Sequence, residues 1–387
     1  MLKKKTELAI VNRGFWEDDS NKVIGEALTD FAEKASEKYR VSVIAQSKGR
    51  LKERLAREGR CKNVRLFFLK SLTSSKNSFF LRALDAALFS CFVFLSLVYL
   101  RPSRIYISTD PPVVVPFIVF LYSFIFRAKY CYHLQDIHPE ASSLVVKLPR
   151  VSYCIMQWMD ALTVRGASKI ITLSEEMKAH IINSRRYGGE VIILENPSGC
   201  YFSEKVAKPN GFVFCGNMGR LQRIPLLVEA IQRYRELGGN GDFTFIGAGA
   251  NAHLVRQLSN EVPGVSYLGP LHPDKASHIL GDHRWAMLPI EDAVTAYAFP
   301  SKSSTYLLSG CGILAICGEN TSVASWALEN EYGVVCRPEV DALVDAFFSL
   351  QNEGLKHDQS FLLESLGDKY SYSRFSSSLI DVAFSME

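Results

Sequence analysis

The stretch that decides the fold is FVFCGNMGRLQRIPLLVEAI, residues 212–231. An apolar run typical of a strand ends at Gly216, a short turn runs to Gly219, and a helical apolar pattern then begins. Glycines let a backbone approach an anion closely, and the first turn of a helix has free N–H groups. Arg220 and Arg223 stand beside this turn and could neutralise a diphosphate. A tight strand-to-helix turn with two solvated arginines is the alternative interpretation.

The same order of strand and helix repeats on both sides of this stretch. Upstream, the pattern predicts strands at 7–12, 41–46, 104–109, 129–136, 169–174 and 190–196, with helices at 22–38, 77–100, 151–166 and 175–182. Downstream, it predicts strands at 212–216, 243–247, 265–269, 285–290, 313–317 and 332–336, again separated by helices. Near-continuous apolar strands that alternate with helices indicate parallel sheets covered on both faces. The sequence therefore predicts an α/β protein with two doubly wound, Rossmann-like domains that face a cleft.

A polar stretch rich in Pro, Gly and Lys, residues 197–211, is interpreted as the linker between the domains. The predicted domains are residues 1–200 and 201–370. A last helix is expected at about 358–384, and residues 371–387 are expected to return to the N-terminal domain.

Composition excludes several classes of protein. The chain has 387 residues, of which 48% are hydrophobic and 22% charged, so disorder, collagen and a disulfide-framed miniature fold are excluded. Its nine cysteines contain no C-x-x-C pair, which favours a reducing compartment. The N-terminus has only four consecutive apolar residues after its basic start, too few for a signal peptide, so a cytoplasmic protein is expected.

Positive charge is concentrated in the first half of the chain. Residues 1–200 carry 30 Lys and Arg against 19 Asp and Glu, and residues 48–82 alone have eleven basic and two acidic side chains. Two uncharged runs follow, 86–100 and 112–126, each shorter than the roughly 20 apolar residues of a spanning helix.

These runs have two interpretations. They are either helices buried against a sheet or, with the basic segment, a region that lies on an anionic membrane surface. The aromatic residues fall on helices instead of strands, so no nucleic-acid partner is expected.

A second segment, AYAFPSKSSTYLLSGCGILAI at 296–316, has a similar pattern. Pro300 and Ser301 begin a predicted helix, and Lys302 in its first turn is a candidate anion ligand. An ordinary exposed lysine is the alternative interpretation.

Together the two segments resemble the C-terminal domain of family 4, GT-B-fold bacterial glycosyltransferases that assemble O-antigen, capsule and exopolysaccharide. The resemblance extends in order over nearly the whole chain. Its further segments are YHLQDIHPE (132–140), ITLSEEMKAHI (171–181), ILENPSG (193–199), FTFIGAGANAHLVRQL (243–258) and VSYLGPLHPDKASHIL (265–280).

The resemblance implies a set of site residues. The donor-binding set is Gly216, Asn217, Gly219, Gln222, Pro289, Ile290, Tyr297, Ser301, Lys302, Thr305 and Tyr306. The catalytic set is Asp136, His138, Arg220 and Arg223, and the acceptor side of the cleft has Gly14 and Gln135.

The chain departs from the family pattern at two informative positions. The family's paired glutamates fall on Tyr297 and Thr305, neither of which is acidic. The second glutamate usually binds the ribose hydroxyls, so either ribose recognition differs here or the chain is non-catalytic. The first strand-to-helix turn, with Gly14, also has one glycine where many relatives have two.

The resemblance implies a retaining glycosyltransferase of bacterial surface polysaccharide synthesis, including lipopolysaccharide and capsule. It would move a sugar from a nucleotide sugar to a lipid-linked or oligosaccharide acceptor, in the cytoplasm and peripheral on the inner face of the plasma membrane. The sequence has no D-x-D triplet and no grouped histidines, so no metal or other cofactor is expected. The alternatives are a non-catalytic GT-B-fold binding subunit and a sugar-nucleotide epimerase.

Overall fold

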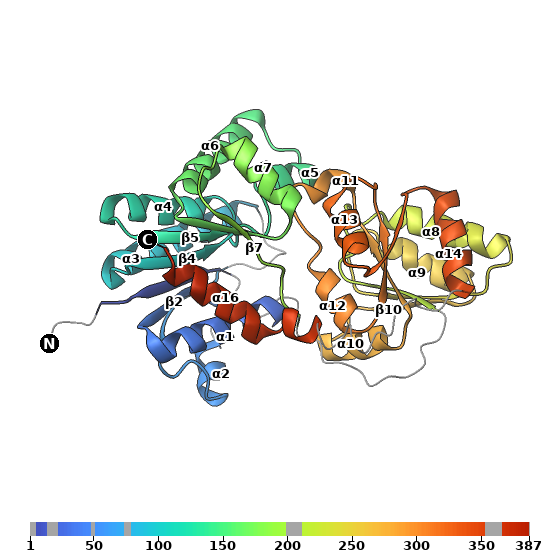
Figure 1. The fold of residues 1–387 in the computed structure, drawn as a ribbon, viewed down its shortest axis with the longest axis horizontal. Coiled ribbons are helices and arrows are strands. Elements are labelled where there is room, and N and C mark those ends of the chain that lie inside the picture. Colours follow the sequence, from blue (N-terminus) through green and yellow to red (C-terminus); the bar gives the residue numbers. More distant parts are fainter. Residues whose placement is uncertain are drawn as a thin grey trace. The chain divides into compact units, whose positions relative to one another are not determined.

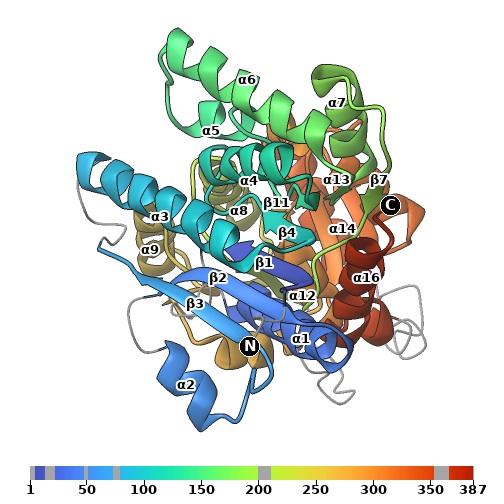
Figure 2. The same ribbon diagram turned by 90° about the vertical axis from the view of Figure 1, so that its left-hand side faces the viewer.

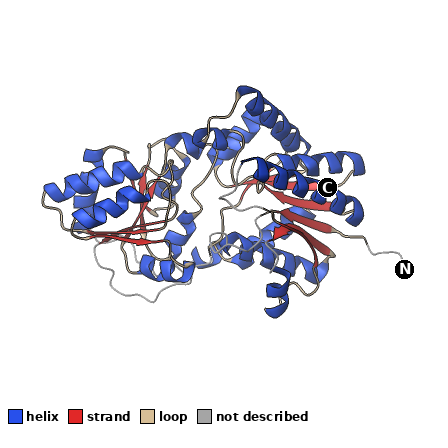
Figure 3. Ribbon diagram, turned by 180° about the vertical axis from the view of Figure 1, so that it is seen from behind, coloured by secondary structure: helices blue, strands red, loops and turns tan. Residues whose placement is uncertain are grey.

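The computed structural model describes residues 5–13, 22–47, 51–72, 79–198, 211–352 and 366–386. The chain divides into two compact units, one of Met1–Pro197 with Ser371–Glu387 and the other of Ser198–Tyr370. Each unit is a single parallel sheet with helices on both faces (Figures 1 and 3). The protein is therefore an α/β protein with two Rossmann-like domains, as the alternation of strands and helices predicts.

The first unit has seven parallel strands in the order β3-β2-β1-β4-β5-β6-β7. The strands are β1 Leu8–Asn12, β2 Val41–Ser47, β3 Arg65–Lys70, β4 Arg104–Ser108, β5 Lys129–His133, β6 Lys169–Thr172 and β7 Val191–Ile193. The helices are α1 Lys22–Lys38, α2 Leu51–Arg57, α3 Phe79–Leu100, α4 Val114–Phe126, α5 Glu140–Val145, α6 Arg150–Gly166, α7 Glu175–Arg185 and α16 Tyr372–Phe384.

Two helix layers cover this sheet. Helices α1 and α16 pack together over one hydrophobic core, to which Phe31, Val43 and Leu379 contribute. Helix α4 packs between α3 and α6 (Figure 2). No helix in the described part of the chain is both long and apolar enough to span a bilayer.

The second unit has six parallel strands in the order β10-β9-β8-β11-β12-β13. The strands are β8 Gly211–Cys215, β9 Asp242–Ile246, β10 Val265–Gly269, β11 Trp285–Pro289, β12 Gly312–Ile316 and β13 Gly333–Cys336. The helices are α8 Ile224–Glu236, α9 Ala252–Glu261, α10 Pro273–Gly281, α11 Asp292–Thr295, α12 Lys302–Leu308, α13 Ser322–Glu329 and α14 Val340–Asn352. Stacked and edge-to-face aromatic rings of Phe212, Phe243 and Phe347 fill the core between this sheet and its helices.

The structure corrects two expectations. The basic segment contains a helix and a strand, α2 and β3, which its charge pattern did not predict because its apolar residues do not alternate regularly. The single helix expected at about 358–384 is interrupted, because the Ser371 hydroxyl accepts a hydrogen bond from the Arg374 N–H and caps a new helix, α16. Gly14 and most of the expected linker, residues 199–210, lie outside the described residues.

Candidate functional site

The order of strands in the second unit indicates where a ligand would bind. The chain leaves β8 toward β9 on one side and later returns to β11 on the other, so the strand order reverses between β8 and β11. Ligands of open α/β sheets bind beyond the carboxyl ends of the strands at such a point. Gly216 follows β8 and Ile290 follows β11, so both predicted donor segments lie at this edge.

Two glycine turns pack tightly against each other at this edge. Gly216 has a φ angle of 144° and its N–H donates to the Ile246 carbonyl at 2.9 Å. The Met218 N–H donates to the Ala248 carbonyl at 2.7 Å. A Cβ atom at Gly247 would lie 2.0 Å from the Gly216 carbonyl oxygen, so that position admits only glycine. The turn from Gly216 to Gly219 is therefore held by backbone contacts.

Lys302 lies against this turn. Its Nζ lies 4.0 Å from the centre of the Phe214 ring and donates to the Gln222 Oε1 at 2.5 Å. Its Cδ lies 3.5 Å from where a Cβ atom at Gly216 would be. Burial lowers the pKa of Lys302 to about 7. No carboxylate in the described ranges forms an ion pair with Lys302, so its cation lacks an anionic partner at this edge.

Arg223 binds protein groups instead of facing the turn. Its Nε donates to the Ile290 carbonyl at 2.8 Å, and its Nη2 forms ion pairs with Glu291 at 3.1 Å and Asp292 at 3.0 Å. The guanidinium therefore fixes the segment after β11 to the start of α8. Arg220, the other predicted catalytic arginine, is exposed in the turn that precedes α8.

Two predicted donor-binding residues of α12 also bond within this unit. The Tyr306 hydroxyl is buried, donates to the Cys215 carbonyl at 2.9 Å and accepts from the Cys215 N–H at 2.8 Å, so it stabilises the end of β8. The Thr305 Oγ1 lies 3.2 Å from the Ser198 Oγ. The positions of the remaining predicted residues follow: Pro289 and Ile290 are buried, Gly219, Gln222 and Tyr297 are half-buried, and Asn217 and Ser301 are exposed.

A second candidate segment, Gln135–His138, follows β5 in the first unit. Burial raises the pKa of Asp136 to about 6, with a further contribution from the negative charge of Asp110. The His138 Nδ1 lies 2.7 Å from the Ser142 Oγ, and burial lowers the pKa of this imidazole. The Gln135 Nε2 donates to the Asn196 Oδ1 at 3.3 Å.

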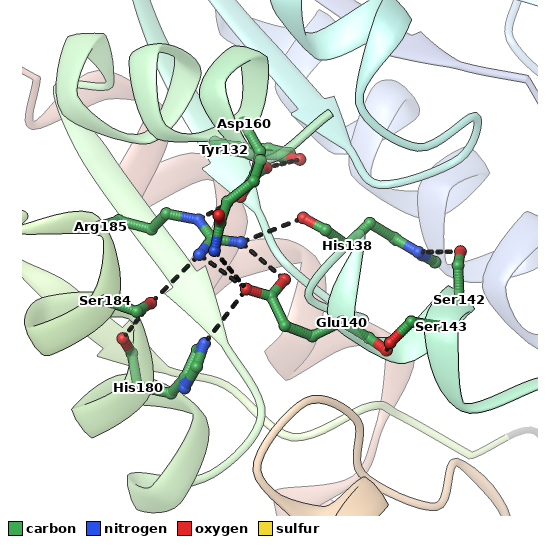
Figure 4. A network of polar contacts seen from close by, with 10 residues as sticks. Tyr132, His138, Glu140, Ser142, Ser143, Asp160, His180, Ser184 and Arg185 are labelled. Atoms are coloured by element: carbon green, nitrogen blue, oxygen red, sulfur yellow. Dashed lines mark hydrogen bonds and ion pairs between the residues drawn. The ribbon is translucent and has the colours of Figure 1, made fainter. Parts of the chain in front are cut away.

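A buried ionic network holds this segment in place (Figure 4). The Arg185 guanidinium donates to both carboxylate oxygens of Glu140, at 2.8 and 2.7 Å, to Asp160 at 2.7 Å and to the His138 carbonyl at 3.2 Å. The Tyr132 hydroxyl donates to the other Asp160 oxygen at 3.3 Å. Burial favours a higher pKa for the Glu140 carboxyl, but interactions with His180 and Arg185 outweigh it and lower the pKa to about 2.

The sequence gives little indication of this network. Glu140 closes the quoted YHLQDIHPE segment, but Asp160 and Arg185 stand 20 and 45 residues farther along the chain. Only the fold places them together. In the described part of the chain, no group of three or more His, Cys, Asp and Glu could hold a metal ion.

Two Rossmann-like parallel α/β units of this kind constitute the GT-B fold. No protein-family model matches the chain. The chain is 22% identical over 288 residues to a probable glycosyltransferase, WbjE, of Pseudomonas aeruginosa, which covers 68% of this chain and 70% of that protein.

Solved structures with the same fold are more distant in sequence. HepE of Anabaena, crystallised with UDP, is 13% identical to this chain. The alignment covers 98% of this chain and 100% of HepE, with a TM-score of 0.67. WaaG, a glycosyltransferase involved in lipopolysaccharide biosynthesis, is 12% identical over 98% of this chain and 100% of WaaG, with a TM-score of 0.60. A putative UDP-N-acetylglucosamine 2-epimerase of Listeria monocytogenes is 11% identical over 99% of this chain and 97% of the epimerase, with a TM-score of 0.61. The likeness therefore establishes the GT-B fold, in which more than one chemistry occurs.

Proposed function

We propose that the protein is a glycosyltransferase that uses a nucleoside-diphosphate sugar as donor. One observation carries this proposal: the half-buried Lys302 cation, without a described anionic partner, lies against the Gly216–Gly219 turn at the point where the strand order reverses. A backbone that a ligand can approach closely and a cation without an ion-pair partner among the described residues fit a diphosphate. The name of the WbjE relative supports glycosyl transfer, and the UDP and UDP-glucose complexes of HepE support a nucleotide-sugar donor.

The residues have separate roles in this proposal. Lys302 and the exposed Arg220 stabilise the departing diphosphate, so no metal ion is needed. Arg223 positions the segment after β11. Asp136 and His138, in the first unit, orient the acceptor hydroxyl, and the Asp136 carboxylate accepts its proton. The second unit binds the donor and the first unit the acceptor. The resemblance to family 4 supports retention of the anomeric configuration.

The proposed setting is the assembly of a bacterial surface polysaccharide. The acceptor is a lipid-linked sugar or an oligosaccharide, met in the cytoplasm at the inner face of the plasma membrane. The lipopolysaccharide role printed for WaaG supports this setting. The excess of basic over acidic residues in residues 1–200 supports a nearby anionic surface.

The test combines donor binding with product analysis. UDP and a panel of nucleotide sugars are expected to raise the melting temperature of the protein, because a ligand stabilises the folded state that binds it. Lys302→Met should abolish the shift, while Lys275→Met, at an exposed lysine of the same unit, should retain it. Absence of a shift with every nucleotide and nucleotide sugar would contradict the proposal.

Mass spectrometry then separates the enzyme from its alternatives. A glycosyltransferase releases the nucleoside diphosphate, by transfer or by slow hydrolysis. A binding subunit, which the non-acidic Tyr297 and Thr305 favour, binds the nucleotide sugar without releasing product. An epimerase returns an altered donor without an acceptor, and either of these results would contradict sugar transfer.

A further inference from the structure

The outer surface of the α3–α4–α6 layer in the first unit is apolar. On α3, the exposed side chains from residue 84 onward are Leu84, Ala87, Leu88, Cys91, Leu95 and Tyr99. On α4 they include Phe124, Ile125 and Phe126, and on α6 they include Val151, Ile155 and Trp158. We call these residues the apolar face. Leu95 is 66%, Phe124 78% and Trp158 59% exposed, so these side chains are well accessible to solvent.

The outer helices of this layer lack an ordinary amphipathic pattern, because α3 is apolar on its buried side, with Phe89, Val93 and Leu97, and on its exposed side as well. The outer helices of a soluble α/β domain bury apolar side chains and expose polar ones. Here α3 buries Asp85, Ser90 and Ser96, and α6 buries Asp160 and Thr163. The expectation that residues 86–100 lie wholly buried against a sheet is therefore wrong for the outer side of α3. Because contiguous apolar surface of this kind is uncommon on monomeric proteins, it indicates a surface that is covered in use.

Aromatic rings connect the helices across this face. The Trp158 ring of α6 lies 5.8 Å from the Phe117 ring of α4. Along α4, Phe117 lies 5.7 Å from Phe120, and Phe120 lies 6.3 Å from Phe124. The apolar face therefore continues from α6 onto α4, which packs in turn against α3 (Figure 2). Tryptophan and tyrosine are enriched where a protein meets the interface of a bilayer.

The exposed charges on and next to helices α3, α4 and α6, between residues 79 and 167, have one sign. The exposed cations lie at or near the ends of the three helices: Arg101, Arg127, Lys129, Lys147, Arg150 and Arg165. The acidic residues between 79 and 167 are all buried or half-buried: Asp85, Asp110, Asp136, Glu140 and Asp160. A cationic rim around an apolar surface complements the anionic headgroups and hydrocarbon of a bilayer.

We propose that the apolar face and its cationic rim dock onto an anionic lipid bilayer, with Leu95, Phe124 and Trp158 entering the headgroup region. A second copy of the chain fits this surface poorly, because two-fold pairing would bring the cationic rims together. This inference deepens the membrane location of the proposed function, and it rests on that function only for the lipid-linked nature of the acceptor.

The basic segment at 48–82 contributes less than its composition indicates. In its described part, Arg60 forms ion pairs with Glu26 and Glu33, and Arg54 lies 3.7 Å from Glu58. Partners of opposite charge reduce the attraction of these arginines to lipid. The exposed Arg57 of α2 therefore serves as a control cation outside the rim.

The experiment measures co-sedimentation of the full chain with phosphatidylcholine vesicles, with and without phosphatidylglycerol. The parent protein should bind only the anionic vesicles, and binding should weaken as salt rises. Leu95→Ser, Phe124→Ser and Trp158→Ser should each weaken binding about tenfold. Arg127→Gln and Arg150→Gln should each weaken it about fivefold at low salt. The controls Leu237→Ser, at an exposed leucine of the second unit, and Arg57→Gln should bind as the parent does.

A second measurement needs no destabilising change. Brominated phospholipid chains should quench part of the tryptophan fluorescence of a Trp16→Phe protein, and adding Trp158→Phe should remove that part, since the remaining Trp285 and Trp326 are buried. The inference is overturned if the parent does not bind anionic vesicles, or if the apolar-face variants bind as well as the controls do. It is also overturned if sedimentation velocity finds a stable dimer that Phe124→Ser dissociates. UDP binding, measured on the same samples, reports on the proposed function separately.

Discussion

The protonation of Lys302 gives the most direct test of the donor site. Burial lowers its pKa to about 7 in the ligand-free protein, and a diphosphate beside the ammonium should return the pKa toward its ordinary value of 10.5. Binding then requires the protonated form, which falls from about three quarters of molecules at pH 6.5 to about 3% at pH 8.5. UDP-glucose affinity should therefore fall about 25-fold over this interval, or about 2 kcal/mol.

Isothermal titration calorimetry measures both the affinity and the proton uptake. At pH 8.5, repeating the titration in buffers of different ionisation enthalpy should give an uptake of nearly one proton per ligand. The diphosphate diester of UDP-glucose does not titrate in this interval, so the proton belongs to the protein. Lys302→Met should bind weakly at both pH values without proton uptake, and Lys275→Met should behave as the parent does. Equal affinity at pH 6.5 and 8.5, with no proton uptake, would refute the assignment of Lys302 to the diphosphate.

Three further predictions concern the two candidate sites. Gly247→Ala, which places a Cβ atom 2.0 Å from a backbone oxygen at a φ angle of 130°, should lower stability by about 1–3 kcal/mol in urea unfolding and weaken UDP binding. Gly188→Ala, with no atom within 4 Å of the new Cβ, should change neither quantity, and equal behaviour of the two variants would contradict the packing argument. Arg220→Ala should weaken UDP binding at least about tenfold, and Arg223→Ala should lower the melting temperature because it breaks the ion pairs with Glu291 and Asp292. Unchanged UDP affinity in both variants would contradict the phosphate assignment. Because the pKa of Asp136 is about 6 and its carboxylate is the proposed base, kcat/KM should increase as the pH rises through 6. This increase should be absent in Asp136→Asn. If the variant shows the same increase of kcat/KM around pH 6, a group other than Asp136 causes it.

Most of the fold could be predicted from the sequence because its signals are local. Helix 22–38 was predicted with the bounds of α1, and the strands at 212–216 and 285–290 correspond to β8 and β11. Regular apolar patterns and glycine turns determine such elements over a few residues. Strand β3 lacks this pattern, since its ends are exposed and its middle is half-buried, and it was missed.

The candidate site was predictable only in part, because its ion pairs are not local. The glycine turn indicated that arginines nearby would face an anion, and the sequence alone assigned Arg220 and Arg223 the same role. The structure separates them, since Arg223 is bonded to Glu291 and Asp292 almost seventy residues away. Tyr306 was likewise predicted as a donor-binding residue from its local sequence, but its hydroxyl bonds to the Cys215 backbone at the end of β8. Only the path of the chain decides which charged groups meet each other and which are left to meet a ligand.

In both units a buried or half-buried arginine bonds to the segment that follows a central strand. These arginines position the segment, and other side chains are left to bind the ligand. In the second unit Arg223 holds the segment after β11, and in the first unit Arg185 holds the segment after β5 through Glu140 and the His138 carbonyl. The two ion pairs differ in burial: the Arg185 side chain is fully buried, whereas Glu291 and Asp292 are 41% and 46% exposed. Removing one partner of a buried pair costs about 3–5 kcal/mol, and solvent screening makes an exposed pair worth far less. Displacing the segment after β5 should therefore cost more free energy than displacing the segment at Ile290, which can adjust more readily to the proposed donor.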